Sequence, residues 1–161
     1  MNQSPSMEIL RDYTAAYFAM EVKILPALNL NEGNVTTRIN PFTGNRQILT
    51  GDVLAVLKRK LPADAFSFLA ISMEDLYPDP SWNFVFGQAS LKERIGVYSF
   101  ARYDPAFYRE ERRKDYQKLL LKRSCKVLVH EMAHMFGLMH CIFFKCVLNG
   151  SNVIEIKFKE A

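Results

Sequence analysis

The sequence has few histidines and cysteines, and it has no long apolar run. Its 161 residues contain three histidines and three cysteines. An odd number of cysteines does not fit a closed disulfide framework, so we expect a reducing compartment, the cytoplasm. The most apolar early stretch, residues 13–30, is interrupted by Glu21, Lys23 and Pro26 and follows no basic leader. We therefore expect neither a secretory signal nor a membrane-spanning helix, and no membrane partner.

The chain also lacks internal repeats and low-complexity linkers. Its 161 residues, 49% of them apolar and 24% charged, are enough for one domain with a hydrophobic core. We expect a single domain over residues 1–161 and a monomer.

Positive charge exceeds negative charge only slightly. There are 21 basic and 17 acidic residues, which gives a net charge of +4. Glu110, Glu111 and Asp115 interrupt the main basic cluster, so we interpret it as the solvated face of a helix and expect no nucleic-acid partner. The cluster comprises Arg109, Arg112, Arg113, Lys114, Lys118, Lys122, Arg123 and Lys126.

All three histidines lie in one stretch of eleven residues, HEMAHMFGLMH. On a helix, His130 and His134 would share one face a turn apart, so that both imidazoles can bind one zinc ion. Gly137 can adopt left-handed backbone angles that end the helix and return His140 to the same ion. Zinc would keep a fourth position for water, and Glu131 beside it can accept a proton. An HExxH pair alone also arises by chance, but the added glycine and third histidine argue against coincidence.

HExxHxxGxxH is the signature of the metzincins, and here it runs directly into Cys141 and then Cys146. This extension resembles the archaemetzincins, whose motif continues as C-x4-C-x-M before a later C-x-x-C pair completes a four-cysteine zinc site. Residues 73–78, 83–90 and 96–103 are also similar to segments of that family, so the likeness covers about residues 10–152.

The resemblance implies a zinc-dependent peptidase that acts on peptides or proteins. It implies His130, His134 and His140 as ligands of the catalytic zinc, and Glu131 as the general base. It also implies that a peptide substrate lies along an edge strand, for which residues 83–90 are the candidate. Only the backbone of that strand would contact substrate, because we interpret Phe84, Val85 and Phe86 as ordinary sheet packing.

The sequence departs from the family pattern at two positions. Leu148 replaces the methionine that packs beneath the metal, an exchange of similar volume that should cost less than about 1.5 kcal/mol. No later cysteine pair follows, so Cys141 and Cys146 would form only half of a second zinc site, and structural zinc usually needs four ligands. Cys125 lies on the same predicted helix as the histidines, which argues against its being a third ligand. We therefore expect one zinc ion, with Cys141 and Cys146 either vestigial ligands or buried apolar side chains.

Periodicity predicts alternating helices and strands. Residues 6–19 suit a helix, residues 21–25 a short strand and residues 40–45 a turn. A helix with Thr50 as N-cap should end before Pro62. The apolar run 66–73 suggests a central strand buried on both faces. Two further strands are expected at residues 83–89 and 95–101, and a long helix at residues 109–136.

This order matches the α/β fold that the resemblance implies, a metzincin-like zincin with a mixed twisted sheet, a backing helix and an active-site helix. Residues 1–137 would form the upper subdomain, and residues 138–161 a small C-terminal, lower one. Apolar residues of this tail should anchor it to the core, and alternation over residues 153–159 suggests a terminal strand. The tail residues concerned are Ile142, Phe143, Phe144, Val147, Ile154, Ile156 and Phe158.

Two other functions stay open. The chain could be a catalytically inert zinc-binding relative whose lower subdomain is incomplete, because the second cysteine pair is missing. A thiol-redox role for Cys141 and Cys146 is less favoured, because their spacing is not the C-x-x-C of dithiol enzymes. We favour the peptidase.

Overall fold

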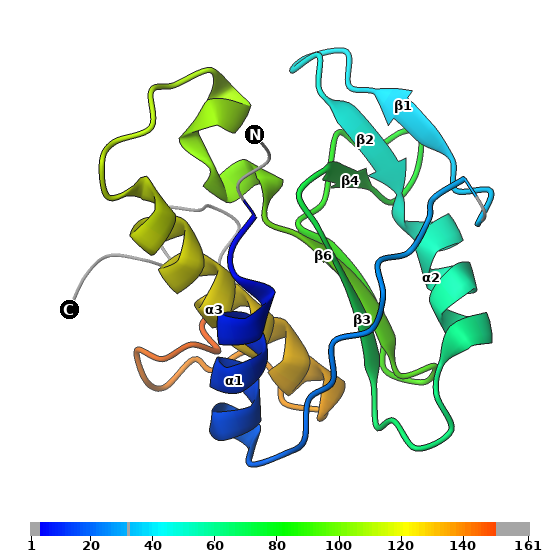
Figure 1. Ribbon diagram of the computed structural model, residues 1–161, viewed down its shortest axis with the longest axis vertical. Helices are drawn as coiled ribbons and strands as arrows, with labels where there is room; N and C mark the ends of the chain where they lie inside the picture. Colours follow the sequence, from blue (N-terminus) through cyan, green and yellow to red (C-terminus); the bar gives the residue numbers. More distant parts are fainter. Residues whose placement is uncertain (1–3, 32, 151–161) are drawn as a thin grey trace. The chain divides into compact units, whose positions relative to one another are not determined.

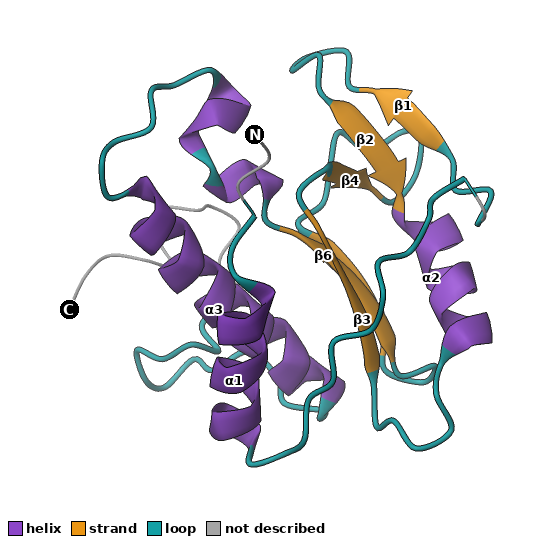
Figure 2. Ribbon diagram, in the orientation of Figure 1, coloured by secondary structure: helices purple, strands orange, loops and turns teal. Residues whose placement is uncertain are grey.

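The structure is a computed structural model that describes residues 4–31 and 33–150. Within these residues, three α-helices accompany two three-stranded sheets (Figure 2). The mixed α/β class predicted from the sequence is confirmed, although the strands form two sheets rather than one. The chain divides into two compact units, one built around Leu25–Arg113 and the other combining the N-terminal helix with the chain after Arg113. No described helix has the length and apolar character needed to cross a bilayer.

The first sheet has the order β1-β2-β4. Its strands are β1 (Thr37–Ile39), β2 (Arg46–Leu49) and β4 (Asp75–Tyr77), with β1 antiparallel and β4 parallel to β2. The predicted turn at residues 40–45 joins β1 to β2. It is closed by the Asn40 side chain, whose Oδ1 accepts hydrogen bonds from the backbone N–H groups of Phe42 (2.8 Å) and Thr43 (3.1 Å).

The second sheet has the order β3-β6-β5. Its strands are β3 (Phe68–Ser72), β6 (Ile95–Ser99) and β5 (Gly87–Ser90), with β3 parallel and β5 antiparallel to β6. The prediction that the apolar run 66–73 is the central strand is wrong. β6 lies in the middle and all five of its residues are buried, whereas those of β3 are only half-buried. An apolar run indicates burial, but pairing on both edges decides which strand is central.

Helix α2 (Thr50–Lys60) is the backing helix and packs against β3 and β6 (Figure 1). Its Val53 and Leu57 form the core of the first unit together with Ile48, Leu76, Ile95 and Val97. Thr50 is not the N-cap, because the helix starts at Thr50 itself and Leu49 precedes it as the cap. The Thr50 hydroxyl instead contacts the Tyr77 carbonyl and the Gln88 side chain, so it joins the helix start to β4 and β5.

Three other expected elements are shorter or missing. Residues 21–25 form no strand; they are mostly exposed and pair with no described strand. Residues 83–86 are irregular apart from one antiparallel bridge between Val85 and Leu76. Residues 109–115 are not helical. The 3₁₀ turn η1 (Ala101–Tyr103) ends at Asp104, and the second, η2 (Pro105–Tyr108), ends at a left-handed Arg109 with φ +62°, so the next helix begins only at Tyr116. The basic cluster therefore lies only partly on a helix.

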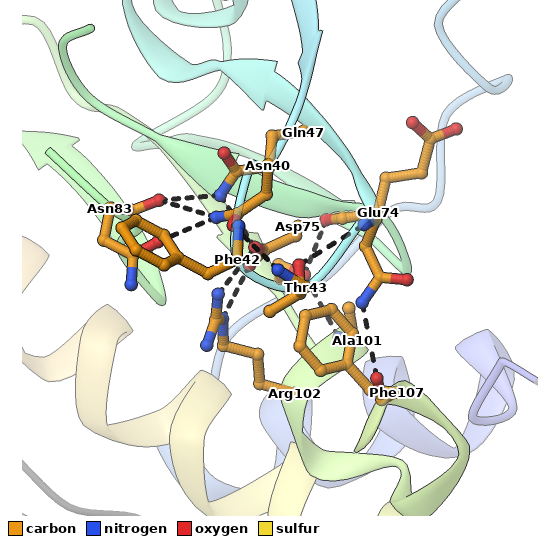
Figure 3. Close-up of polar contacts among 12 residues, drawn as sticks. Asn40, Phe42, Thr43, Gln47, Glu74, Asp75, Asn83, Ala101, Arg102 and Phe107 are labelled. Carbon is orange, nitrogen blue, oxygen red and sulfur yellow. Dashed lines mark hydrogen bonds and ion pairs between the residues drawn. The ribbon is translucent and has the colours of Figure 1, made fainter. Parts of the chain in front are cut away.

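A buried polar network connects the strands of the first unit (Figure 3). Arg102 donates from Nε and Nη2 to the two carboxylate oxygens of Asp75, each at 2.8 Å. Gln47 Nε2 donates to Asp75 Oδ2 and to the Asn83 carbonyl, also at 2.8 Å each. The Arg102 guanidinium lies 3.4 Å from the centroid of the Phe84 ring. The network thus fixes the irregular segment that leads into β5. Phe84 packs on a guanidinium in this segment and not within a sheet, as the sequence had suggested.

The second unit contains α1 (Met7–Phe18) and α3 (Tyr116–Met135), which pack side by side (Figure 1). The helix predicted at residues 6–19 is confirmed, and the Ser6 side chain caps it by accepting a hydrogen bond from the Ile9 N–H at 3.3 Å. The ring of Phe18 at the end of α1 stacks on Phe136 at the end of α3, with centroids 5.1 Å apart. These contacts support the end of α3 that carries the histidines.

Candidate metal centre

The last turns of α3 carry His130 and His134 one helical turn apart. Their Nε2 atoms lie 3.1 Å from each other, so both imidazoles project to the same point. His130 is only 3% exposed, whereas His134 is half-buried. The predicted sharing of one helix face is confirmed.

Gly137 ends the helix in the way that the sequence predicts. Its φ is +83°, and its N–H donates to the His134 carbonyl (2.8 Å) while the Leu138 N–H donates to the Ala133 carbonyl (3.1 Å). This pair of bonds is the Schellman motif, in which a left-handed residue satisfies the last carbonyls of a helix. A Cβ at Gly137 would meet no atom within 4 Å, so the backbone angle and not space requires glycine.

The reversal at Gly137 brings His140 back to the other two histidines. Each histidine of the three offers a ring nitrogen within 4.8 Å of those of the other two. The ring centroid of His140 lies 5.2 Å from that of His130 and 4.8 Å from that of His134. His140 is exposed, so the group is buried at His130 and open at His140.

Backbone carbonyls orient two of the imidazoles. His130 Nδ1 lies 2.6 Å from the Val147 carbonyl oxygen, and His134 Nδ1 lies 2.6 Å from the Leu138 carbonyl oxygen. Because a carbonyl only accepts, each Nδ1 must carry a proton, and in the neutral imidazoles this leaves a lone pair on each Nε2. These are the atoms that face one another. These tautomers suit metal binding, because a histidine that binds zinc usually donates its other ring N–H to a carbonyl or carboxylate.

The group fits a zinc ion. Two nitrogens bound to one tetrahedral zinc at about 2.0–2.1 Å lie about 3.4 Å apart, close to the 3.1 Å between the two Nε2 atoms. Within the described ranges 4–31 and 33–150, no other cluster of three or more histidine, cysteine, aspartate or glutamate side chains is close enough to share an ion. Glu131 follows His130 on α3 and is half-buried, and its role as base stays a prediction.

Cys141 and Cys146 lie close together in the loop after His140. Both are free thiols, Cys141 half-buried and Cys146 exposed. Backbone N–H groups of Phe144 and Phe143 lower the pKa of Cys141, and the Cys146 side chain adds to this effect. Burial in α3 instead raises the pKa of Cys125. Among the described side chains, no third histidine, cysteine, aspartate or glutamate lies close enough to bind a metal ion together with this cysteine pair.

The prediction that the apolar tail residues pack on the core is wrong for the three residues that follow Cys141. Ile142, Phe143 and Phe144 are 84%, 83% and 76% exposed. Val147 and Leu148 are half-buried. The loop is organised by its own hydrogen bonds, which the Asn149 side chain makes with three of its backbone groups. Ile154, Ile156, Phe158 and the predicted terminal strand lie outside the described residues.

The candidate substrate strand is shorter than predicted. Only Gly87–Ser90, strand β5, pairs as a strand, and β5 is an edge of its sheet. Gly87 is required there, because a Cβ would lie 2.2 Å from Tyr98 Cδ1. The carbonyls of Leu138 and Val147 that contact the histidines could not be predicted from the sequence, since backbone groups leave no signal in residue type.

Comparison with known proteins places these residues in one family. The chain is 42% identical to human archaemetzincin-2 over 91% of its length, but this match covers only 47% of the human protein. The chain therefore spans about half the length of the curated relatives it matches. Its structure resembles the crystal structures of archaemetzincins from Methanopyrus kandleri (TM-score 0.62, 30% identity, 94% of this chain and 77% of that one) and Archaeoglobus fulgidus (TM-score 0.63, 29% identity, 92% and 80%). The model of peptidase family M54 matches residues 12–160, and the chain therefore belongs to that family.

Proposed function

We propose that this chain is a zinc-dependent metallopeptidase in which His130, His134 and His140 hold the catalytic zinc and Glu131 is the general base. The observation that carries the proposal is the convergence of three imidazoles, two of which contact backbone carbonyls through Nδ1 and turn Nε2 toward each other. Family membership supports the same chemistry.

In this proposal the zinc site, Glu131 and strand β5 each have a separate role in hydrolysis. A zinc ion held there supplies a Lewis acid that polarises the scissile carbonyl and lowers the pKa of water. Glu131 removes a proton from the attacking water and passes it to the departing amine, so one carboxylate is first base and then acid. Strand β5 offers its free edge to the backbone of an extended peptide, which pairs without reading side chains.

Zinc content and peptide cleavage, measured on the same purified protein, test the proposal. We expect one zinc per chain and cleavage of unfolded protein that a chelator abolishes and zinc restores. Glu131→Ala should keep its zinc and lose turnover by about 10²- to 10⁴-fold, whereas His140→Ala should lose zinc. Glu110→Ala, which removes an exposed acid outside the motif, is the control. Full activity of Glu131→Ala, or unchanged zinc in His140→Ala, would refute these assignments.

The second candidate is a catalytically inert zinc-binding relative. The exposure of Ile142, Phe143 and Phe144 favours it, since these side chains leave the segment after His140 with little apolar support. A wild-type chain with one tightly bound zinc and no cleavage of any unfolded protein would establish this alternative over the peptidase.

Several finer properties belong to the same proposal. We propose a metzincin-like domain with upper subdomain 1–137 and lower subdomain 138–161. We also propose one zinc ion per chain, a monomer, peptide or protein substrates, and no nucleic-acid or membrane partner. The three free thiols support a reducing compartment, the cytoplasm.

A further inference from the structure

We propose that Asn149 is a positioning residue for the metal centre. Its side-chain amide would hold residues 141–149 in the loop shape that places backbone groups against two of the three histidines. This inference rests on the proposed zinc site, and it assigns a role to a residue outside the histidine motif.

The Asn149 side chain bonds to three backbone groups of the loop. Its Oδ1 accepts from the Cys146 N–H at 2.8 Å, and its Nδ2 donates to the Cys141 carbonyl at 2.9 Å and to the Phe144 carbonyl at 2.7 Å. The partners fix the orientation of the amide, because two carbonyls need donors and one N–H needs an acceptor. Both amide N–H donors and the amide oxygen of Asn149 are therefore hydrogen-bonded to backbone groups of one loop.

The backbone closes the same loop at its base. The Cys141 N–H donates to the Leu148 carbonyl at 2.9 Å, and the Asn149 N–H donates to the Cys146 carbonyl at 3.1 Å. These two backbone bonds join the ends of the loop but do not involve Phe144. The Asn149 side chain lies inside the loop and also bonds to the Phe144 carbonyl.

Apolar packing contributes little to this loop. Ile142, Phe143 and Phe144 are each more than three-quarters exposed. Because burial cannot hold these residues, hydrogen bonds restrain this part of the loop: Asn149 holds the Phe144 carbonyl, and Cys141 Sγ accepts from the Phe144 N–H at 3.4 Å.

The contacts with the histidines lie on both sides of Asn149. Two residues before it, the Val147 carbonyl oxygen lies 2.6 Å from His130 Nδ1. One residue after it, Gly150 passes so close to His140 that a Cβ would lie 2.9 Å from His140 Nδ1. A shift of the backbone at Asn149 would therefore disturb the tautomer and orientation of His130 and the ring position of His140 together.

Two substitutions separate this role from general stability. Asn149→Ala removes all three side-chain bonds. Asn149→Asp keeps the shape and the acceptor for the Cys146 N–H but cannot donate to the two carbonyls. Phe143→Ala is the matched control, because it alters the same loop at an exposed side chain and leaves the hydrogen bonds in place.

The measurement is zinc affinity by competition with a chromogenic chelator, which does not depend on turnover. Both Asn149 variants should bind zinc about 10- to 100-fold more weakly than wild type, the usual effect of losing an outer-shell partner. Phe143→Ala should bind as wild type does. The visible spectrum of the cobalt-substituted protein should change in the Asn149 variants, because it reports ligand geometry, while circular dichroism of the metal-free protein should not.

The outcomes are distinct. Wild-type affinity and cobalt spectrum in both Asn149 variants would overturn this inference and leave the proposed function intact. Unfolding of both variants would show a structural role and overturn it as well. If only Asn149→Ala unfolds, Asn149→Asp decides. A wild-type chain that binds no zinc would overturn the proposed function and this inference together.

Discussion

Arg102 and Asp75 form a two-fold hydrogen-bonded ion pair, with both donor–acceptor distances 2.8 Å, although the two side chains are only 7% and 0% exposed. They are 27 residues apart in the sequence, and Arg102 also stacks on Phe84. The pair therefore ties β4 to the first 3₁₀ turn and to the segment that leads into β5.

Removing one partner of this pair should destabilise the protein strongly. Asp75→Ala leaves the Arg102 guanidinium buried without its counter-ion, which should lower the free energy of unfolding by about 3–5 kcal/mol. Glu74→Ala is the control, because Glu74 forms a partly exposed pair with Arg46 at 3.2 Å and should cost less than about 1 kcal/mol. Urea unfolding measures both. Equal losses of unfolding free energy in the two variants would contradict a larger contribution of the buried ion pair.

Gly87 should not tolerate a side chain. A Cβ there would lie 2.2 Å from Tyr98 Cδ1 and 2.9 Å from the Val97 carbonyl oxygen, so Gly87→Ala should cost about 1–3 kcal/mol through overpacking. Gly51→Ala in α2 meets no atom within 4 Å and should stabilise the protein by up to about 1 kcal/mol. Thermal unfolding of the two variants tests this difference, and a neutral Gly87→Ala would contradict the tight contact.

Gly137 should be sensitive for a different reason. Space is free around it, but its φ of +83° is left-handed. Gly137→Ala should therefore cost about 1–2 kcal/mol and weaken zinc binding, because the turn places His140. Gly137→Asn should cost less, since asparagine adopts left-handed angles more readily. Chemical unfolding and zinc titration measure the two effects. Alanine and asparagine variants of equal stability would argue against a backbone cause.

Asp104 should make stability sensitive to acid. The Arg112 guanidinium, which donates at 3.0 Å and 2.7 Å, lowers the pKa of Asp104 in the folded protein, and the Ala106 N–H adds to the effect. A lowered folded-state pKa gives stability that is complete above the unfolded value of about 3.9 and is lost as pH falls through the folded value.

Arg112→Ala tests that linkage. The variant should be less stable than wild type at neutral pH, and the difference should shrink as pH falls below the unfolded pKa of Asp104. Urea unfolding at several pH values measures it. A difference that stays constant with pH would show that Arg112 acts through packing and not through the charge of Asp104.

The local features of the site could be predicted because they depend on residues that are close in sequence. The spacing of His130 and His134 follows from the helix period, and the stop at Gly137 follows from its freedom at positive φ. The N-terminal helix and the turn at residues 40–45 are correct for the same reason. Each is decided by contacts within a few residues.

Features that depend on distant partners were missed or wrong. The length of the apolar run 66–73 could not reveal that β6 pairs on both edges and β3 on one. The predicted start of the last helix at residue 109 is wrong, because α3 begins at Tyr116, after the left-handed Arg109 and the Asp104–Arg112 pair. The exposure of Phe143 and Phe144 also depends on what the fold brings near them, which composition does not contain.

The sequence by itself determined where three imidazoles can converge, since the helix period and a helix-ending glycine follow from residue type and spacing alone. Only the tertiary structure decided what holds them. The Val147 carbonyl contacts His130, 17 residues earlier in the chain. The Asn149 side chain bonds to three backbone groups of the loop that contains Val147. Backbone carbonyls are chemically the same at every residue. The pattern of side chains therefore cannot predict which carbonyl will contact a histidine in the folded protein.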